Sequence, residues 1–369
     1  RRMQSVAHIL EQAAERFGAR PILGTRTRNG WQWTTYAELR ALTAQVRAAL
    51  VAHGVGRGDR VGIVAPNGVA WAAGCYAAAG LGAIWVPMYA AQQIEEWAYI
   101  LRDCEAKLVF AATEPWAEQI EERRAELPAL REVIRLDAPP EDPRSWAAFL
   151  ASAAEPAPIE AVAASDPAGF IYTSGTSGEP KGVVLSHGNL TSNTEAACIA
   201  VPLTTEDCSL SFLPWAHAFG QTAELHTLVT QGCRIAINDD ISRLMDRLTE
   251  VRPTLLIAVP RVLHRVHEGV VKQLQKKPPL FTRLVDRVVT AHRRQRAGGR
   301  RSVAERLLHA AVDRVVFRPV RDKLGGRLRL TVSGSAALSP EVADFIYVMG
   351  IVLCEGYGLT ECSPIVTAN

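Results

Sequence analysis

The spacing of apolar residues predicts helices that alternate with buried strands along the first half of the chain. Thr35 and Glu38 have the spacing of a capping box, which marks the start of a helix. Apolar residues then recur on one helical face, at Leu39, Leu42, Val46 and Leu50. Short apolar runs at 61–65, 107–111 and 132–136 predict strands. This alternation predicts an α/β fold with a largely parallel sheet.

The segment 69–88 is apolar enough to require a choice between a membrane span and a buried core. No charged residue lies between Arg60 and Glu95, and the segment is long enough for a span. It is dominated by alanine and glycine, however, and it contains Pro87. A buried helix that runs into a buried strand at 83–87 explains the same pattern without lipid. We therefore expect two core elements here.

The segment 137–167 is predicted to be a surface connection. It carries six prolines among many alanines and acidic residues, a composition that does not favour a packed element. A strand at 170–172 follows it, and the first motif with recognisable chemistry begins directly after that strand.

Positive charge is concentrated in the segment 261–329, which contains 19 Lys or Arg and 5 Asp or Glu, whereas the whole chain has a net charge of only +3. Its apolar residues keep helical spacing and predict an amphipathic helix, at Val303, Leu307, Leu308, Ala311, Val312, Val315 and Val316. Five arginines are expected to exceed the acidic groups near them, namely Arg293, Arg294, Arg296, Arg300 and Arg301. A solvated basic face, an anionic membrane surface and the phosphates of CoA are all compatible with this charge. No nucleic-acid-binding motif accompanies it, so nucleic acid is not an expected partner.

The composition is that of a globular enzyme, with 48% hydrophobic and 21% charged residues. The length predicts two large lobes or one composite domain. Seven cysteines form no CxxC pair, so neither a zinc site nor a disulfide framework is indicated. This pattern favours a reducing, cytoplasmic setting.

Residues 173–182 read Thr-Ser-Gly-Thr-Ser-Gly-Glu-Pro-Lys-Gly and lie between two strand-like runs. Glycines let backbone N–H groups turn toward an anion, hydroxyls add short donors, and Lys181 adds a positive charge. The segment is not a Walker A loop, because Lys181 follows Pro180 and no Ser or Thr succeeds it. It therefore predicts a phosphate cradle of another kind.

Two motifs carry a family resemblance. Residues 172–182 resemble the phosphate-loop signature of the adenylate-forming superfamily, and 355–361, Glu-Gly-Tyr-Gly-Leu-Thr-Glu, are similar to its adenine and magnesium motif. The segments 33–39 and 58–61 also resemble N-terminal landmarks of that superfamily, so the resemblance covers the chain. It implies two helix-flanked, largely parallel sheets packed together, with interleaved lobes at about 1–55 plus 196–350 and 56–195, and a basic helical insertion at 262–329.

The resemblance also implies roles for individual residues. Lys181, Thr360 and Glu361 would serve catalysis, with Glu361 and Thr176 holding Mg²⁺ and Thr360 placing its hydroxyl on the α-phosphate of ATP. Tyr357 would pack on adenine, opposite the segment 333–337. The implied nucleotide-binding set is Thr173, Ser174, Gly175, Thr176, Ser177, Gly178, Lys181, Gly334, Ser335, Ala336, Gly356, Tyr357, Gly358 and Thr360. Such a reaction joins two anions, so the site must supply cations and oriented donors.

His217 ends the segment 211–217, which resembles a third landmark whose histidine or aromatic residue borders the acyl pocket. That resemblance implies a positioning role for His217, although a lone histidine is also compatible with a satisfied core position. A Ser-His-Asp hydrolase is a different enzyme class, and the chain has no Gly-x-Ser-x-Gly elbow to support it.

The insertion and the residues Cys362, Ser363 and Pro364 after the second motif resemble long-chain fatty acyl-CoA synthetases of the AMP-forming type. The implied substrates and cofactors are a fatty acid, ATP, Mg²⁺ and CoA. An acyl-AMP ligase that loads a carrier protein is the nearest alternative. The family's ribose-binding aspartate, hinge and C-terminal lid domain are expected beyond Asn369, so a nucleotide-binding fragment with little activity stays open as a further alternative. Oligomeric state is left open by the sequence.

Overall fold

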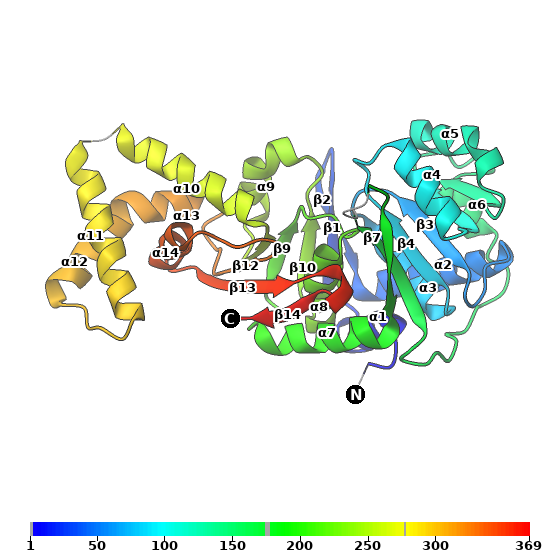
Figure 1. Cartoon of the computed structure of the whole chain (residues 1–369), viewed down its shortest axis with the longest axis horizontal. Helices are drawn as coiled ribbons and strands as arrows, with labels where there is room; N and C mark the ends of the chain where they lie inside the picture. Colours follow the sequence, from blue (N-terminus) through cyan, green and yellow to red (C-terminus); the bar gives the residue numbers. More distant parts are fainter. Residues whose placement is uncertain (1–2, 174–177, 277) are drawn as a thin grey trace. The chain divides into compact units, whose positions relative to one another are not determined.

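The computed structural model describes residues 3–173, 178–276 and 278–369 (Figure 1). The chain divides into two compact units. Unit 1 comprises Arg1–Thr205, Leu213–Ile237 and Leu359–Ile365, and unit 2 comprises Glu206–Phe212, Asn238–Gly358 and Val366–Asn369. These boundaries fall at other residues than those of the lobes expected from the resemblance, which stay a prediction.

A six-stranded sheet forms the centre of one half of unit 1, in the order β6-β5-β3-β4-β7-β8. Its strands are β3 (Arg60–Val64), β4 (Ile84–Met88), β5 (Leu108–Ala111), β6 (Glu132–Arg135), β7 (Pro167–Thr173) and β8 (Lys181–Ser186). All neighbours pair in parallel except β8, which runs antiparallel to β7. The predicted strands and the largely parallel sheet are confirmed.

The apolar segment 69–88 is a core element, as predicted. It forms α3 (Val69–Gly80), in which every residue from Trp71 on is buried, and then the fully buried strand β4. None of the helices in the described ranges is both long and apolar enough to cross a membrane. The helices α4 (Ile94–Asp103) and α5 (Glu114–Glu122) pack on each other, and α5 packs on β6 (Figure 1). A short 3-10 helix, η1 (Arg124–Glu126), follows α5.

The remainder of unit 1 contains a second set of strands in the order β10-β1-β2. These are β1 (Pro21–Thr27), β2 (Gly30–Thr35) and β10 (Arg234–Ile237). The helices around them are α1 (Val6–Phe17), α2 (Tyr36–Ala52), α7 (His187–Ala200), the π-helix η2 (Gly220–His226) and α8 (Thr227–Gln231). The predicted capping box is present, because the Thr35 side chain accepts a hydrogen bond from Glu38 N and the Glu38 carboxylate accepts one from Thr35 N.

The prediction that 137–167 lacks packed structure was wrong in part. The segment contains α6 (Trp146–Ala151), whose N-cap Ser145 accepts a hydrogen bond from Ala148 N. Phe149 is buried and stacks on Trp146 with ring centroids 5.7 Å apart. A single turn-and-a-half of helix is too short to produce a periodic pattern in the sequence, and the prolines around it dominate the local signal.

Unit 2 contains four strands in the order β13-β12-β11-β9. They are β9 (Cys208–Ser211), β11 (Leu255–Ala258), β12 (Leu330–Ser333) and β13 (Val352–Gly358), and all neighbours pair in parallel. Outside the basic segment, unit 2 also contains most of the strand β14 (Ile365–Ala368), the 3-10 helix η3 (Ile241–Arg243) and the helices α9 (Leu244–Val251) and α14 (Pro340–Val348). The 3-10 helix η5 (Thr360–Cys362) belongs to unit 1. The described strands thus belong to two sheets flanked by helices, which confirms the predicted fold class.

Helices fill most of the basic segment of unit 2. They are α10 (Pro260–Gln275), α11 (Pro279–Arg296), α12 (Val303–Val312), the π-helix η4 (Asp313–Phe317) and α13 (Arg318–Lys323). The five clustered arginines outnumber their acidic partners, as expected, although three of them are paired and only Arg300 and Arg301 form no ion pair with a described residue. Arg293 and Arg296 both bind Asp344 on α14, and Arg294 binds Glu305. Sequence distance hid these partners, since Asp344 lies about fifty residues further along the chain.

Candidate functional site

The predicted phosphate loop connects two paired strands of unit 1. Thr173, at the end of β7, is the register partner of Lys181, at the start of β8. Gly178 has φ +96°, a conformation that glycine adopts without strain. The side chain of Lys181 is exposed and forms no ion pair with a described residue. Four predicted loop residues, Ser174, Gly175, Thr176 and Ser177, lie outside the described ranges.

Tyr172 anchors β7, the strand that precedes the phosphate loop. Its hydroxyl donates a 2.6 Å hydrogen bond to the Asp103 carboxylate at the end of α4. Burial, and next the hydrogen bond to Asp103, raises the pKa of Tyr172, so the hydroxyl stays a donor. A Cβ atom at Gly182 would lie 2.9 Å from the Tyr172 ring, so only glycine fits against this ring at the register position opposite it.

Thr360 and Glu361 lie in η5, which follows β13 in sequence and belongs to unit 1. Thr360 is buried, and Glu361 is exposed and forms no ion pair with a described residue. Two bonds to the Asn193 side chain fix the chain just after η5, because Asn193 Nδ2 donates to Ile365 O over 2.7 Å and Asn193 Oδ1 accepts from Ile365 N over 3.1 Å. Asn193 on α7 therefore positions the second motif.

A cavity of about 300 Å³ in unit 1 joins residues from both motifs. Its lining residues are Tyr89, Gln92, Glu96, Ile171, Tyr172, Thr173, Pro180, His217 and Thr360. The tertiary structure thus brings together three of the predicted site residues, Thr173, His217 and Thr360, which are far apart in sequence. It also adds groups that the sequence did not single out.

His217 borders this cavity beside Tyr89, with ring centroids 6.2 Å apart. His217 Nδ1 accepts a hydrogen bond from Phe219 N over 3.3 Å. His217 as a whole residue is exposed to solvent. The protein around its ring nevertheless desolvates the imidazole and lowers its pKa below the usual value. A neutral imidazole beside the cavity fits a positioning role better than a charge-bearing one.

Tyr89, Gln92 and Glu96 were missed from the sequence, although a signal for them exists. Tyr89 directly follows β4, and β4 pairs in parallel with β7, so both strands end at the same edge of the sheet. Ligands of parallel α/β sheets collect outside the carboxyl ends of strands. Burial raises the pKa of Tyr89 to about 12, and Tyr89 O accepts a hydrogen bond from Trp97 Nε1.

The predicted adenine-binding residues gather in unit 2, at the carboxyl ends of β11, β12 and β13. The strands are in register with Ala258 opposite Ser333 and Ser333 opposite Glu355. Gly334 N donates to Ala258 O over 3.2 Å, and Ser335 has φ 70°. These contacts place Gly334, Ser335 and Ala336 next to the strand that carries Gly356, Tyr357 and Gly358.

Two observations at this edge suit a bound polar ring. The Tyr357 side chain is 66% exposed, so its ring face is free to stack on a ligand. Ser333 Oγ is buried and has no hydrogen-bond partner among the described residues. A buried hydroxyl of this kind costs free energy unless water or a ligand satisfies it.

The side chains near Glu361 show whether a metal ion could be bound there. No group of three His, Cys, Asp or Glu in the described ranges could hold a metal ion by itself. Mg²⁺ is commonly bound through one or two carboxylates together with phosphate oxygens, and the exposed, unpaired Glu361 carboxylate fits that mode. Thr176, the other predicted ligand, lies outside the described ranges.

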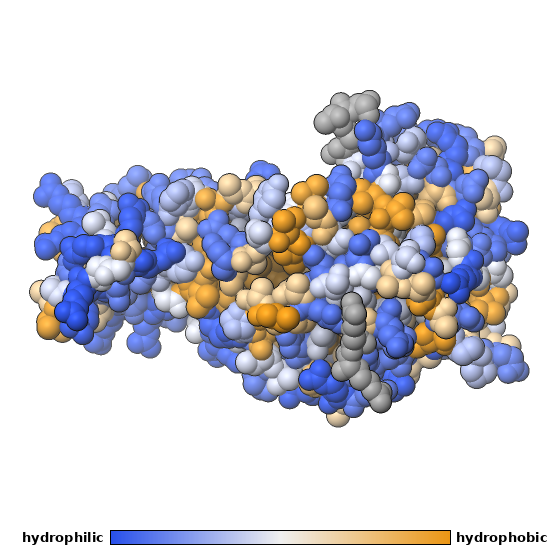
Figure 2. Space-filling view, turned by 60° about the horizontal axis from the view of Figure 1, so that its bottom comes forward, coloured by the Kyte–Doolittle hydropathy of each residue, from blue (hydrophilic) through white to orange (hydrophobic). Residues whose placement is uncertain are grey.

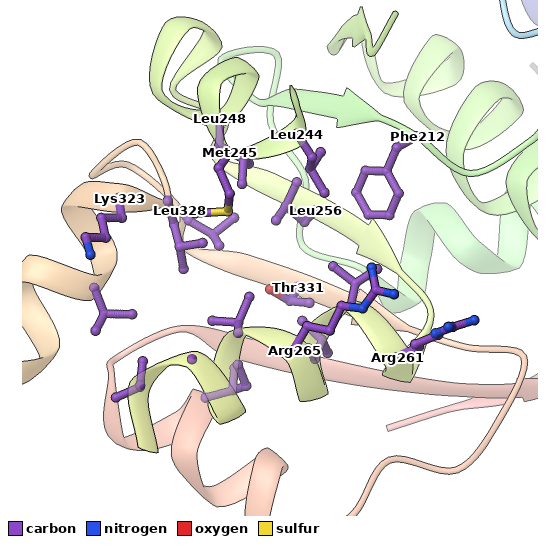
Figure 3. Close-up of a pocket in the computed structure, with 18 of the residues that line it drawn as sticks. Phe212, Leu244, Met245, Leu248, Leu256, Arg261, Arg265, Lys323, Leu328 and Thr331 are labelled. Carbon is purple, nitrogen blue, oxygen red and sulfur yellow. The ribbon is translucent and has the colours of Figure 1, made fainter. Parts of the chain in front are cut away.

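A separate, apolar pocket of about 580 Å³ lies within unit 2 (Figure 3). Figure 3 shows Leu244, Met245, Leu248, Leu256 and Leu328 converging on it, with Thr331 on the strand β12 at its wall. Its cationic residues stand at opposite ends, Arg261 and Arg265 on α10 at one and Lys323 on α13 at the other. The interior therefore offers hydrocarbon contacts, and its volume is typical of small-molecule sites.

The two helix-flanked sheets carry the glycine-rich segment and the threonine–glutamate turn that resemble the adenylate-forming superfamily. The family model described as AMP-binding enzyme matches residues 10–369, so the chain belongs to this family. It is 33% identical over 347 residues to long-chain-fatty-acid–CoA ligase FadD15 of Mycobacterium bovis, which covers 90% of this chain and 56% of that protein. It is 28% identical over 375 residues to the peroxisomal long chain acyl-CoA synthetase 7 of Arabidopsis thaliana, which covers 96% and 52%. The chain spans about half the length of the curated relatives it matches.

Solved structures share the fold. The N-terminal domain of FACL13 from Mycobacterium tuberculosis matches with a TM-score of 0.74 at 23% identity and covers 99% of this chain and 79% of that one. A long-chain-fatty-acid–CoA ligase from Archaeoglobus fulgidus also gives 0.74, at 20% identity, with 99% and 66% covered. These likenesses confirm the predicted N-terminal adenylate-forming fold.

Proposed function

We propose that the protein to which this chain belongs activates a long-chain fatty acid with ATP and transfers the acyl group to CoA. The family supports the adenylate-forming ligase chemistry. The observation that carries the choice of acid is the apolar pocket of about 580 Å³ in unit 2. The names of relatives from Mycobacterium bovis and Homo sapiens, long-chain-fatty-acid–CoA ligases at 33% and 30% identity, support the same choice.

The proposed reaction has two steps, adenylation of the acid and transfer of the acyl group to CoA. A carboxylate oxygen of the acid forms a bond to the α-phosphorus of ATP, the bond from that phosphorus to the bridging oxygen breaks, and pyrophosphate leaves. The CoA thiolate sulfur then attacks the carbonyl carbon, and AMP leaves. Both steps gather negative charge, so transition-state stabilisation by fixed cations and donors is the main contribution the protein makes.

The chain's own residues are suited to that contribution. Lys181 has no counter-ion among the described residues and is free to bind phosphate oxygens. The hydroxyls of Thr173 and Thr360 line the same cavity and would donate to the nucleotide, while His217 and Tyr89 border the space where the carboxylate would lie. Glu361 would hold Mg²⁺, which neutralises phosphate charge when bound.

Gly269 offers a direct test of the pocket. It lines the pocket, and a Cβ atom built on it meets nothing within 4 Å, so Gly269→Leu adds an apolar side chain at the pocket lining without a clash at Cβ. Glu268→Leu is the matched control, because it adds the same side chain to the next, exposed position of α10 outside the pocket lining. Activity would be measured in the full-length protein as acid-dependent ATP–pyrophosphate exchange.

We expect palmitate to exceed octanoate in kcat/KM by about 100-fold or more, since each buried methylene contributes about 0.8 kcal/mol. Gly269→Leu should lower the palmitate value by about tenfold or more and leave octanoate nearly unchanged. Equal kcat/KM values for the two acids, or a loss shared by Glu268→Leu, would contradict the pocket assignment.

The acceptor is a separate part of the proposal. An acyl-AMP ligase would release pyrophosphate with the same acids and yet form no AMP when CoA is added. Because the chain spans 56% of its mycobacterial relative, residues 1–369 alone are a candidate for nucleotide binding with little turnover. Coupled AMP formation with CoA by the full-length protein supports the proposed acceptor, and its absence, with exchange intact, favours a carrier protein.

A further inference from the structure

The exposed face of α12 is apolar, which is the reverse of an ordinary surface helix. Val303 is 65% exposed and Leu307, one turn later, is 68% exposed. The other exposed positions of the helix are Ala304, Arg306, Ala310 and Ala311. The sequence predicted a helix with apolar residues at helical spacing from Val303 to Val316, and of these residues only Val312 and Val316 are buried.

Polar contacts on the opposite face fix this orientation. His309 Nε2 donates to Val348 O over 3.0 Å, and His309 Nδ1 accepts from Arg301 over 2.8 Å. Glu305 binds Arg294 over 2.6 Å and also closes the capping box with Ser302 at the start of the helix. These bonds hold α12 against α11 and α14, so Val303 and Leu307 are directed outward by the fold and are not free to turn inward.

Exposed arginines lie on the apolar face and next to it in the sequence. Arg306 lies on it, Arg300 precedes the helix, and Arg314 and Arg318 follow in η4 and α13. All four are exposed and none forms an ion pair with a described residue, although the charge of Arg318 contributes to the lowered pKa of Asp313. Val315, 48% exposed, extends the apolar positions between Arg314 and Arg318. Figure 1 shows α11 and α12 side by side, and in Figure 2 the end of the molecule that carries these helices is mostly hydrophilic, with scattered hydrophobic residues.

We propose that this face, formed by Val303, Arg306, Leu307, Arg314 and Val315, docks the protein on an anionic lipid bilayer. An interfacial helix places apolar side chains at the acyl boundary and arginines among the headgroups, and this face carries both. A second copy of the chain would bring the same uncompensated arginines together, and like charges disfavour that contact. Nucleic acid would use the arginines and leave Val303 and Leu307 without partners.

The inference does not depend on the proposed ligase activity, because docking is measured without turnover. The protein would be sedimented with vesicles of phosphatidylcholine, with and without phosphatidylserine. The test variant combines Arg306→Gln with Leu307→Gln, both at exposed positions that no fold contact requires. The matched control combines Arg28→Gln with Ile199→Gln, an exposed arginine and an 87% exposed isoleucine of unit 1.

We expect binding to the phosphatidylserine vesicles that weakens with salt, and a partition coefficient that the test variant lowers by about tenfold or more while the control leaves it unchanged. The single variants Arg306→Gln and Leu307→Gln distinguish a lipid bilayer from a polyanion. Binding that depends on Arg306 and not on Leu307 would indicate a polyanion such as nucleic acid and overturn the proposal.

Two further outcomes would contradict docking of the α12 face on a bilayer. Equal partitioning of parent and test variant would show that another face binds. Concentration-dependent self-association that Leu307→Gln abolishes, measured by sedimentation equilibrium, would assign the face to a second copy. Circular dichroism of the test variant, with unchanged helix content, shows that the comparison is between folded proteins.

Discussion

Gly182→Ala tests whether the phosphate loop depends on the contact between Gly182 and the Tyr172 ring. The added Cβ would lie 2.9 Å from Tyr172 Cζ, closer than Cβ atoms approach, and 3.2 Å from the hydroxyl oxygen, which is a tight contact. The ring is buried and its hydroxyl is bonded to Asp103, so it has little room to yield. Relief requires the ring to move or the β7–β8 pair to separate, and both shift Thr173 and Lys181.

The magnitude follows from two contributions. Overpacking a tight contact costs about 1–3 kcal/mol, and losing a hydrogen bond to a carboxylate costs about 1.5–3 kcal/mol. We therefore expect the free energy of unfolding to fall by about 2.5–6 kcal/mol in urea titrations, and pyrophosphate exchange by the full-length protein to fall by more than tenfold. Gly56→Ala is the control, because its Cβ would meet only one atom, the Asp59 carboxylate oxygen at 4.0 Å.

A double-mutant cycle identifies the cause. In a Tyr172→Ala background the ring is absent, so Gly182→Ala should add little further loss. A full additional loss in that background would show that Gly182 matters for some reason other than its contact with Tyr172, and the reasoning would be refuted.

Three other predictions follow from single groups. Glu361→Gln in the full-length protein should reduce Mg²⁺-dependent pyrophosphate exchange by about 3 kcal/mol of transition-state stabilisation, a loss of more than 100-fold, and near-normal exchange would end the metal assignment. Thr331→Val should raise the free energy of unfolding by about 1 kcal/mol and strengthen binding of a fluorescent fatty acid, because Thr331 Oγ1 lies buried at the pocket wall without a partner among the described residues; weaker binding would show that a ligand or water uses this hydroxyl. Burial lowers the pKa of His187 to about 4, and its Nδ1 accepts a hydrogen bond from Val6 N. As the pH falls below 6.5, His187 binds a proton in the unfolded chain but stays neutral in the folded chain. The contribution of neutral His187 to the free energy of unfolding is therefore fully present above pH 6.5 and is lost as the pH falls toward 4. Between pH 7 and pH 5 the loss should be about 2 kcal/mol larger than in His187→Gln, and parallel urea titrations that show no difference would contradict it.

Elements with a local signal could be predicted from the sequence alone. The capping box of Thr35 and Glu38 appears as predicted, and so do the buried run of α3 into β4 and the strands on either side of the phosphate loop. Such features depend on residues within a few positions of each other, and their spacing is visible in one dimension. The phosphate-binding role of residues 173–182 could be predicted from the sequence for the same reason, since contiguous glycines, hydroxyls and Lys181 form the pattern, and it stays a prediction.

Contacts between residues far apart in sequence, and the face of each helix that is covered, could be read only from the folded chain. Asp344 forms ion pairs with Arg293 and Arg296, which lie on a helix about fifty residues earlier in the chain. The Asn193 side chain donates a hydrogen bond to Ile365 O, four residues after Glu361. The spacing of α12 predicted an apolar face, but the contacts of His309 and Glu305 turned Val303 and Leu307 toward solvent. Periodicity states that a helix has a face, whereas the direction of that face depends on partners that only folding brings near.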